Sequence, residues 1–464
     1  IAGAPNIFNV VNLDKSQKKT PKTGWHEQTQ SFFYSLELGW KSQLFVTTTG
    51  RNDWASQLAN SPQKSFFYPS VGVSWLPSST FNFPEKFNYL KIRASWASVA
   101  NPFPRELTIA THPYDDTISG WDDKSNYPIG QLYPERTKTW ELGFDARFLH
   151  GFTLSASWYR ADTYNQTFNP NLSASSGYSD IYIQTGHVRN TGVEASLGYD
   201  HQWKNWNWNS QFTFSWNKNK IIELCKEWYN PITEETITMN RLQISKLGRA
   251  KFILKEGGSM GDLYSTTDLR RDDKGNIEID EGGNVVVEDN LPDMKLGSVF
   301  PDYNLAWRNS VSWKNLNLGF LVTARIGGIV NSLTQANMDL FGVSEATAAA
   351  RDAGGALVNG RSLVNPETWY TAIASQGGIP QYYTYSATNV RLQELSLGYT
   401  IPRKWLHNVC SITVSFVGRN LWMMYCKAPF DPEAVASTNN FYQGMDYFMM
   451  PSTRNLGFNI NIKF

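Results

Sequence analysis

The sequence predicts an all-β protein, a transmembrane antiparallel β-barrel, on three observations. The chain ends in a stretch that alternates strictly between apolar and polar residues, the same alternation recurs along the 464 residues, and short connections alternate with long ones. A period of two places successive side chains on opposite faces of a strand, so that one face meets lipid and the other water.

The last strand shows the alternation most clearly. Its apolar residues would face lipid, and they are Leu456, Phe458, Ile460, Ile462 and Phe464. The residues between them are Asn455, Gly457, Asn459, Asn461 and Lys463, which would face the lumen. A two-faced strand at the carboxyl terminus is typical of the strand that closes an outer-membrane barrel.

About twelve further strands are expected upstream, and they share this pattern. They are centred on 32–40, 44–49, 71–75, 90–96, 139–148, 152–158, 193–199, 206–216, 303–313, 316–326, 390–399 and 412–421. Thirteen is an odd number, whereas single-chain bacterial barrels have an even number of strands. We therefore expect at least one strand to be missing from the front of this chain.

The connections predict an orientation. Residues 1–464 are expected to form one unit, the carboxy-terminal part of a barrel, with long polar loops at about 97–136, 217–301, 328–387 and 421–452. Outer-membrane barrels have short periplasmic turns and long external loops, so we expect the long loops to be extracellular and the carboxyl terminus periplasmic. A soluble propeller would also alternate, but it would repeat every 40 to 50 residues or so, and no such repeat is seen.

Composition agrees with a barrel. Aromatic residues make up 14% of the chain, including 18 Trp, yet the charged fraction is 18% and the mean hydropathy is −0.41. Without an apolar run of about 18 residues, this composition excludes a helical membrane protein. A net charge of +1 gives no reason to expect nucleic acid. No signal peptide is visible at Ile1, so we expect a mature segment or a fragment.

Several segments in order resemble a known family. They are 68–75 (YPSVGVSW), 90–96 (LKIRASW), 188–194 (VRNTGVE), 214–220 (FSWNKNK), 389–399 (NVRLQELSLGY), 417–421 (VGRNL), 430–433 (FDPE) and the terminal strand. From about Ser31 to Phe464 the chain resembles the carboxy-terminal barrel portion of a SusC-like TonB-dependent outer-membrane transporter, the SusC/RagA family of Bacteroidetes.

The resemblance implies a function and a set of partners. It implies a 22-stranded barrel, of which this chain holds roughly the last thirteen strands, with the plug domain and the first strands missing. It further implies TonB-dependent import of an oligosaccharide across the outer membrane, with a SusD-like surface lipoprotein as cap and the TonB complex acting through the absent plug. A peptide importer of the same family is the alternative, as is a passive porin or structural barrel; an enzyme is not expected.

Aromatic side chains in the predicted external loops are the candidate ligand contacts, because flat rings stack on sugars and anchor protein interfaces. They are Trp121, Tyr127, Tyr133, Trp369, Tyr370, Tyr382, Tyr383 and Tyr385. The alternative is that they pack within their own loops or against the lipoprotein. Among them, Trp121, Trp369 and Tyr383 are the preferred ligand contacts.

No catalytic residue, cofactor or metal is expected, although three patterns in the sequence partly match a calcium site, a catalytic serine and a disulfide. The segment 272–281 carries Asp272, Asp273 and Asp280, but Lys274 stands where a Ca²⁺ ligand should be, so a hairpin turn is favoured over a calcium site. Gly257–Gly261 matches G-x-S-x-G but is followed by loop-like sequence. The cysteines lack metal spacing, and a Cys225–Cys426 disulfide stays possible.

Overall fold

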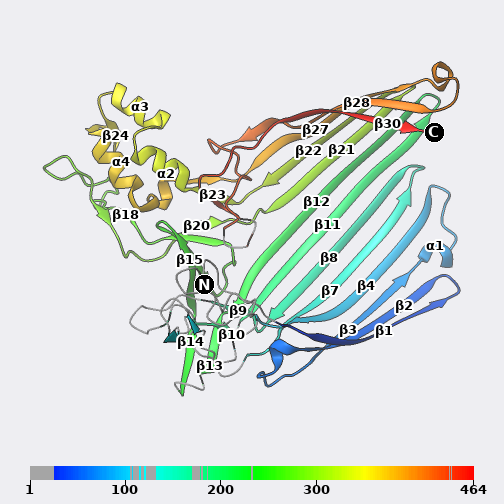
Figure 1. The fold of residues 1–464 in the computed structure, drawn as a ribbon, viewed down its shortest axis with the longest axis horizontal. Helices are drawn as coiled ribbons and strands as arrows, with labels where there is room; N and C mark the ends of the chain where they lie inside the picture. The colour runs from blue at the N-terminus through cyan, green and yellow to red at the C-terminus, as the bar shows by residue number, and fades with distance from the viewer. Residues whose placement is uncertain are drawn as a thin grey trace, which may run out of the picture.

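The computed structural model describes residues 26–464, with gaps at 105–106, 108–113, 116–119, 122–131, 170–177, 179–180, 185, 231–233, 438 and 440–441. A sheet of thirteen antiparallel strands forms its main body (Figure 1). The strands, in sheet order, are β1 (Thr29–Trp40), β2 (Leu44–Ala55), β3 (Phe66–Trp75), β4 (Phe87–Asn101), β7 (Glu135–Phe148), β8 (Phe152–Tyr164), β11 (His187–Trp203), β12 (Trp206–Glu223), β21 (Tyr303–Trp313), β22 (Leu316–Ile326), β27 (Asn389–Ile401), β28 (Ser411–Cys426) and β30 (Asn455–Lys463). All thirteen strands predicted from alternation are confirmed. We call this sheet the barrel wall.

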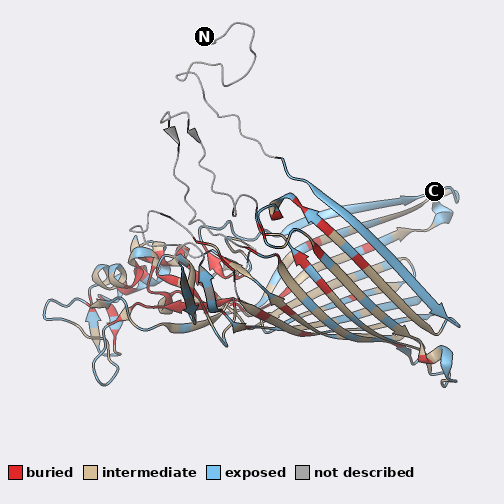
Figure 2. Ribbon diagram, turned by 90° about the horizontal axis from the view of Figure 1, so that it is seen from below, coloured by how far each residue is buried: buried red, intermediate tan, exposed pale blue. Residues whose placement is uncertain are grey.

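Short turns join the strands at one end of the wall, and long connections join them at the other (Figure 1). Two of the tight turns place consecutive residues at positive φ, Lys41 with Ser42 and Leu149 with His150. Such turns match the right-handed twist of the strands that they connect. The sheet is curved rather than flat, as Figure 2 shows.

The register of the wall separates two faces. The outer face carries apolar side chains such as Leu142 and Trp158, which are paired across β7 and β8. The inner face carries Asp145 and Glu194. Asp145 lies three residues after Leu142 on β7, and Glu194 lies one residue after the outward Val193 on β11, so both point to the opposite face. Each strand thus presents one apolar and one polar side, as the period of two predicts.

The terminal strand β30 follows the prediction. Its apolar residues pair with outward apolar residues of β28, and Phe458 lies edge-on against Phe416 with ring centroids 5.8 Å apart. Leu456, Ile460 and Ile462 share that face and are exposed. Among the residues that the structure describes, β30 pairs with β28 alone, and β1 pairs with β2 alone.

A second body of structure lies beyond the long-connection end of the strands (Figure 1). We call residues 224–302 and 327–388 the loop layer. Its elements are β13 (Cys225–Asn230), β14 (Glu235–Met239), β15 (Arg241–Leu247), β16 (Ala250–Lys255), β17 (Asp262–Ser265), β18 (Asp268–Leu269), β19 (Val287–Glu288), β20 (Met294–Ser298), β23 (Ile329–Ser332), α2 (Leu333–Leu340), α3 (Glu345–Asp352), β24 (Ala356–Val358), β25 (Ser362–Val364), α4 (Pro366–Ala374) and β26 (Thr384–Ser386).

The loop layer has hydrophobic cores of its own. Phe252, Leu263 and Val299 are fully buried together, and Met445 of β29 (Met445–Asp446) joins them from the last loop.

The helices of the loop layer begin at side-chain caps: Ser332 accepts a hydrogen bond from the amide of Gln335, which satisfies a donor that the first turn leaves free. None of the helices in the described ranges has the length and apolar character that a membrane-spanning helix needs.

The remaining elements are short; the 3₁₀ turns at Ser375–Gly377 and Pro380–Tyr382 belong to the loop layer, and the others lie in the other connections. They are α1 (Pro77–Thr80), β5 (Tyr114–Asp115), β6 (Gly120–Trp121), β9 (Thr167–Phe168), β10 (Ile183–Gln184) and single 3₁₀ turns at Ser56–Leu58, Ser375–Gly377, Pro380–Tyr382 and Arg403–Leu406.

Candidate functional site

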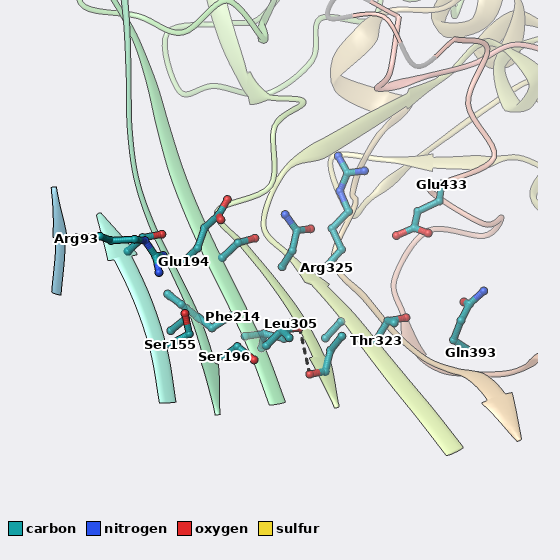
Figure 3. A pocket seen from close by; sticks show the side chains of 17 residues that line it. Arg93, Ser155, Glu194, Ser196, Phe214, Leu305, Thr323, Arg325, Gln393 and Glu433 are labelled. Carbon is teal, nitrogen blue, oxygen red and sulfur yellow. Dashed lines mark hydrogen bonds between the residues drawn. The ribbon is translucent and has the colours of Figure 1, made fainter. Parts of the chain in front are cut away.

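A hollow of about 670 Å³ lies against the inner face of the wall (Figure 3). Six neighbouring strands contribute small hydroxyl and amide side chains to it: Ser155 and Ser157 from β8, Ser196 from β11, Thr213 and Ser215 from β12, Asn304 from β21, Thr323 from β22 and Gln393 from β27. Those of β8, β11, β12, β21 and β22 reach the same space because they stand at inward positions of their strands. Gln393 stands at a bulge of β27, where the register shifts between Leu392 and Glu394. The floor of the hollow can therefore donate and accept hydrogen bonds over a broad area.

Four charged side chains stand around this polar floor, two of each sign: Arg93, Glu194, Arg325 and Glu433. Arg93 is held in place by Asp145, with an Nη1 to carboxylate distance of 2.8 Å, and by Glu141 at 3.6 Å. The site is thus polar and close to neutral, with no single-sign field.

The segment after β28 is fastened over the inner face by a buried charge cluster. Arg391 donates two hydrogen bonds to Asp431, at 2.8 and 3.1 Å, and both side chains are almost fully buried. Glu433 lies 3.2 Å from the same guanidinium. Burial alone would raise the pKa of Asp431, but the hydrogen bonds from Arg391 hold it below its ordinary value. Asp431 is therefore a carboxylate at neutral pH and acts as an anchor.

Arg325 stands above the hollow with incomplete pairing. Its Nη2 donates to the carbonyl of Val299 at 2.9 Å, while its buried Nε has no hydrogen-bond partner among the described residues. Burial lowers the hydration of a guanidinium, so a free donor there favours a ligand that brings an acceptor.

The apolar–polar alternation in the sequence puts Arg391, Arg325, Arg93 and Glu194 at inward positions, and the strand register agrees with it. It did not reveal that Arg391 pairs with Asp431 across 40 residues. The signal for it was present, because 430–433 was one of the family-like segments and its carboxylates had no assigned partner.

The predicted ligand aromatics of the third long loop pack together in the loop layer. Tyr383 is buried, and its hydroxyl donates to Asp339 at 3.0 Å; burial raises the pKa of this hydroxyl. Trp369 and Tyr382 meet edge-on at 5.9 Å, against the same core as Tyr370.

These aromatics therefore have packing partners in the structure, and Tyr383 has almost no exposed surface to offer a ligand. Tyr385 is half-buried and meets Phe430 of the anchored segment edge-on at 5.7 Å. Burial raises the pKa of the Tyr385 hydroxyl to about 12. Direct ligand contact by this group stays a prediction.

The other predicted ligand aromatics, Trp121, Tyr127 and Tyr133, belong to the first long loop, which the structure describes only in part. Trp121 belongs to β6, which pairs with β5, and Tyr127 lies outside the described residues. Tyr133 is 41% exposed, and its backbone amide and carbonyl hydrogen-bond to the side chain of Gln184.

The acidic stretch near Asp272 forms turns. Asp272 accepts hydrogen bonds from the amides of Lys274 and Asn276 at 2.9 and 2.8 Å, and Asp280 accepts one from Asn284 at 2.7 Å. The hairpin turn predicted here is confirmed, and it occurs twice, eight residues apart. No cluster of three or more potential metal ligands occurs in the described part of the chain, and the calcium alternative near Asp272, Asp273 and Asp280 stays untested.

Two other patterns have structural roles. Ser259 of the G-x-S-x-G stretch donates its hydroxyl proton to Asn219 at 3.2 Å, and its amide donates to Asp262. The bond to Asn219 fastens the loop layer to the end of β12, and the bond to Asp262 lies within the loop layer. Cys225, Cys410 and Cys426 are thiols, so the Cys225–Cys426 disulfide is not formed.

Comparison with known proteins gives one matching family model. The model for the TonB dependent receptor-like β-barrel matches residues 3–421. Among curated relatives, the chain is 27% identical to TonB-dependent receptor P3 of Formosa agariphila, over 99% of this chain and 48% of that protein. It is 21% identical to TonB-dependent receptor SusC of Bacteroides thetaiotaomicron, over 81% of this chain and 38% of that protein. The chain spans about half the length of the relatives that it matches.

Solved structures give the same fold. The chain superimposes on the RagAB peptide importer in its open-open state with a TM-score of 0.72 and 18% identity, over 97% of this chain and 49% of that one. The closed-closed state gives a TM-score of 0.71 with 19% identity, over 97% of this chain and 50% of that one. These likenesses confirm the fold.

Proposed function

The chain belongs to the TonB-dependent receptor-like β-barrel family, and on that premise we propose that it forms part of the wall of a transporter that actively imports an oligosaccharide across the bacterial outer membrane. In this proposal the chain is the SusC-like barrel of a SusC/SusD-type complex. A SusD-like lipoprotein caps the loop layer on the cell surface, the short turns and the carboxyl terminus face the periplasm, and TonB acts through a plug that fills the lumen.

The hollow on the inner face is the observation that carries the choice of an oligosaccharide. Eight of its 17 lining residues carry hydroxyl or amide side chains, and these come from six strands. Sugar hydroxyls are both donors and acceptors, and a wall of Ser, Thr and Asn side chains offers both without the desolvation cost of burying charges.

A peptide is the second candidate, and the charges at the hollow favour it. Arg93 and Arg325 face Glu194 and Glu433 around the same space. A peptide carries a charge of each sign at its termini and could pair with both kinds of group. The RagAB structures, which share the fold, are of a peptide importer.

The proposal is tested by measuring oligosaccharide uptake in cells that express a variant with its inner-face hollow filled by larger side chains. Ser157→Leu with Ser196→Leu would replace hydroxyls by apolar bulk on the hollow floor, and we expect the rate of labelled-oligosaccharide uptake to fall at least tenfold. The protein is used in the full length that its gene encodes, with surface amounts checked by antibody. Unchanged oligosaccharide uptake in this variant would contradict the proposal.

A matched pair on the same face controls for assembly. Ser35→Leu with Thr47→Leu makes the same kind of change on inward positions of β1 and β2 that do not line the hollow, and uptake should be kept. Competition by a peptide mixture but not by oligosaccharides would select the peptide alternative. Uptake that survives a protonophore would select the passive porin, because TonB-dependent transport needs the proton-motive force.

The loop aromatics remain candidate contacts for ligand or lipoprotein. We propose Trp121 and Trp369 as the first to test, since a stacked ring contributes about 1 kcal/mol, or roughly fivefold in affinity. Ala at both should weaken binding of the oligosaccharide or of the co-purified lipoprotein. Trp405→Ala, an exposed Trp in the turn after β27, is the control. If neither binding changes, these residues are packing elements.

A further inference from the structure

Six basic side chains gather on the outer face of β7, β8, β11 and β12, near the loop layer. We call Arg136, Lys138, Arg160, Arg189, Lys218 and Lys220 the basic patch. The strand register places Lys138, Asp162, Arg189 and Lys220 in one row across the four strands. Arg160 and Lys218 stand in the adjacent row toward the middle of the wall.

These side chains share the outer face with the lipid-facing residues of the same strands. Lys218 and Lys220 follow Phe214 and Trp216 at steps of two along β12, and the pairing of β11 with β12 is unbroken from Val188 to Trp203. An unbroken register preserves the alternation, so the lysines point the same way as the aromatic residues.

The patch keeps an excess of unpaired positive charge. Asp162 is almost fully buried and accepts from Nε of Arg160 at 2.9 Å and from Nε of Arg189 at 2.6 Å. This pairing leaves the terminal guanidinium nitrogens of both arginines without a hydrogen-bond acceptor among the described residues. Lys218 and Lys220 are exposed and likewise have none. Nε2 of His187 also lies 2.6 Å from Oδ1 of Asp162. Glu223, which stands opposite His187 in the strand register, is a second carboxylate at this edge.

The height of the patch matches the headgroup region of a bilayer. Along β12 the outward aromatic residues begin at Trp206 and end at Trp216. Ten residues at about 3.3 Å each span about 33 Å along a strand, or about 25 Å across the membrane at a tilt near 40°. That is the height of the apolar band of such barrels, so Lys218 and Lys220 stand just beyond it.

The patch is local, and an apolar hollow lies directly beneath it. In the row of Lys138, the outward positions of β1 to β4 carry no charge: Tyr34, Gly50, Pro69 and Ser98. Toward the membrane, a hollow of about 510 Å³ opens on the outer face, and its apolar lining is Leu90, Ile92, Leu142, Phe144, Trp158 and Val193. A charged site above an apolar hollow fits an amphiphile with an anionic head and a hydrocarbon chain.

We propose that the basic patch binds the phosphate groups of a phosphorylated glycolipid of the lipid A type in the outer leaflet, with one acyl chain in the apolar hollow. Arginine forks and lysine ammonium groups are the side chains that recognise phosphate. The site is distinct from the inner-face hollow and serves to hold the barrel wall in its membrane. The assignment to the outer leaflet rests on the orientation given under the proposed function.

Titration of the full-length protein in detergent with purified lipid A, followed by native mass spectrometry, tests the site. Lys138→Gln with Lys218→Gln and Lys220→Gln removes three charges that form no ion pair among the described residues; Lys138 only lies over the ring of Tyr164, 5.3 Å from its centroid. The fold should therefore be kept, and this is checked by heat-modifiable migration. Each basic residue near an anionic surface contributes roughly fivefold, so we expect lipid A to bind on the order of 100-fold more weakly. Parent-like affinity in this variant would overturn the proposal.

The opposite rim of the wall offers a matched control. Lys41→Gln with Lys204→Gln and Lys314→Gln makes the same charge change in the short turns, and lipid A should bind as to the parent. Lipid A stripped of its phosphates should bind the parent as weakly as it binds the patch variant; equal binding of both lipids overturns the role of phosphate.

A second variant tests the acyl chain without changing charge. Val193→Trp would fill the apolar hollow, and lipid A should bind more weakly while the patch stays intact. Unchanged binding overturns the assignment of the chain to this hollow.

Orientation is measured separately on intact cells with a membrane-impermeant thiol reagent. Asp273→Cys in the loop layer should react and Lys314→Cys in a short turn should not, each compared with the parent. The reverse pattern would show that the orientation in the proposed function is wrong. The expected labelling together with a failed lipid titration would overturn the lipid site alone.

Discussion

The barrel wall and the loop layer differ in the exposure of their apolar side chains. In the wall, outward residues are open to the surroundings, with Trp140 57% and Leu142 55% exposed. In the loop layer, Phe252, Leu254 and Leu263 are fully buried in cores that the loops form among themselves. The wall is thus built to be covered by lipid, whereas the loop layer is built as a water-soluble protein is. The two regions should therefore respond differently to the same kind of substitution.

The largest effect is expected at the buried charge cluster that fastens the segment after β28 to the wall. Arg391→Leu would leave Asp431 buried and unpaired next to Glu433, and losing one partner of a buried ion pair costs about 3–5 kcal/mol. The anchored segment should release from the inner face. Hydrogen exchange of residues 427–436 measures the release, and we expect protection to be lost there while the strands stay protected.

Arg419→Leu is the control for this change. Arg419 pairs with Glu394 at 3.3 Å, but its side chain is 67% exposed, and exposed pairs contribute little. If both variants behaved alike, the buried cluster would not be the fastening point between strand β27 and the last loop.

The next effect tests the wall itself. Phe458→Arg places a charge near the middle of the outer face of β30, and we expect a loss of about 2–4 kcal/mol in the free energy of folding into a bilayer. Asn459→Arg puts the same charge on the inner face one residue along, where water or polar groups can solvate it. Urea titration in lipid vesicles compares them. Equal losses would show that the two faces of the terminal strand do not differ as the register indicates.

The wall was predictable from the sequence because its pattern is local. Alternation identified all thirteen strands, but several of them extend beyond the predicted ends. The prediction ended β12 at Trp216, whereas the strand runs to Glu223. Lys218 and Lys220 occupy the next outward positions of β12. Because they are charged, the alternation of apolar and polar residues, from which the strand was predicted, stops at Trp216.

The loop layer was not predictable because its contacts join residues far apart in the chain. Asn331 pairs in parallel with Met445, 114 residues away, and no period in the sequence announces such a contact. The same holds for the aromatic side chains. Tyr383 was singled out as a ligand contact because it is an aromatic residue in a predicted external loop, whereas its burial beside Asp339 depends on where α2 packs.

A smaller effect, specific to the loop layer, depends on pH. Hydrogen bonds from Arg241 at 2.6 and 2.8 Å, together with Lys255 at 2.9 Å, lower the pKa of Asp293 to about 2. Because the pKa in the folded state lies below that of the unfolded chain, the stabilisation is present above about pH 4 and is lost as the pH falls toward 2. Allowing for solvent screening, it amounts to about 1–2 kcal/mol.

Hydrogen exchange of β15, β16 and β20, corrected for intrinsic rates, checks this from pH 6 to pH 2.5. Protection in these strands should fall over the last two units, while the strands of the wall change less. Asp293→Asn should show the reduced protection already at pH 6 and little further pH dependence. A parent-like pH profile in that variant would assign the acid sensitivity to another group.

The smallest effect concerns the two repeated turns, and it decides between a turn and a cation site. Asp272→Ala removes a carboxylate that accepts hydrogen bonds from the side chain and the backbone amide of Asn276, and Asp280→Ala removes one that accepts from the backbone amide and the side chain of Asn284. These hydrogen bonds hold the pKa of each carboxyl below its usual value. Both carboxylates are fully exposed, so we expect only local fraying of residues 270–286, seen as faster amide exchange in the hairpins. If the carboxylates serve the turns alone, millimolar Ca²⁺ leaves exchange in the parent unchanged. If Ca²⁺ instead slows exchange in the parent but not in Asp272→Ala, the cation binds at these carboxylates. A bound ion, and not packing alone, would then hold this hairpin of the loop layer.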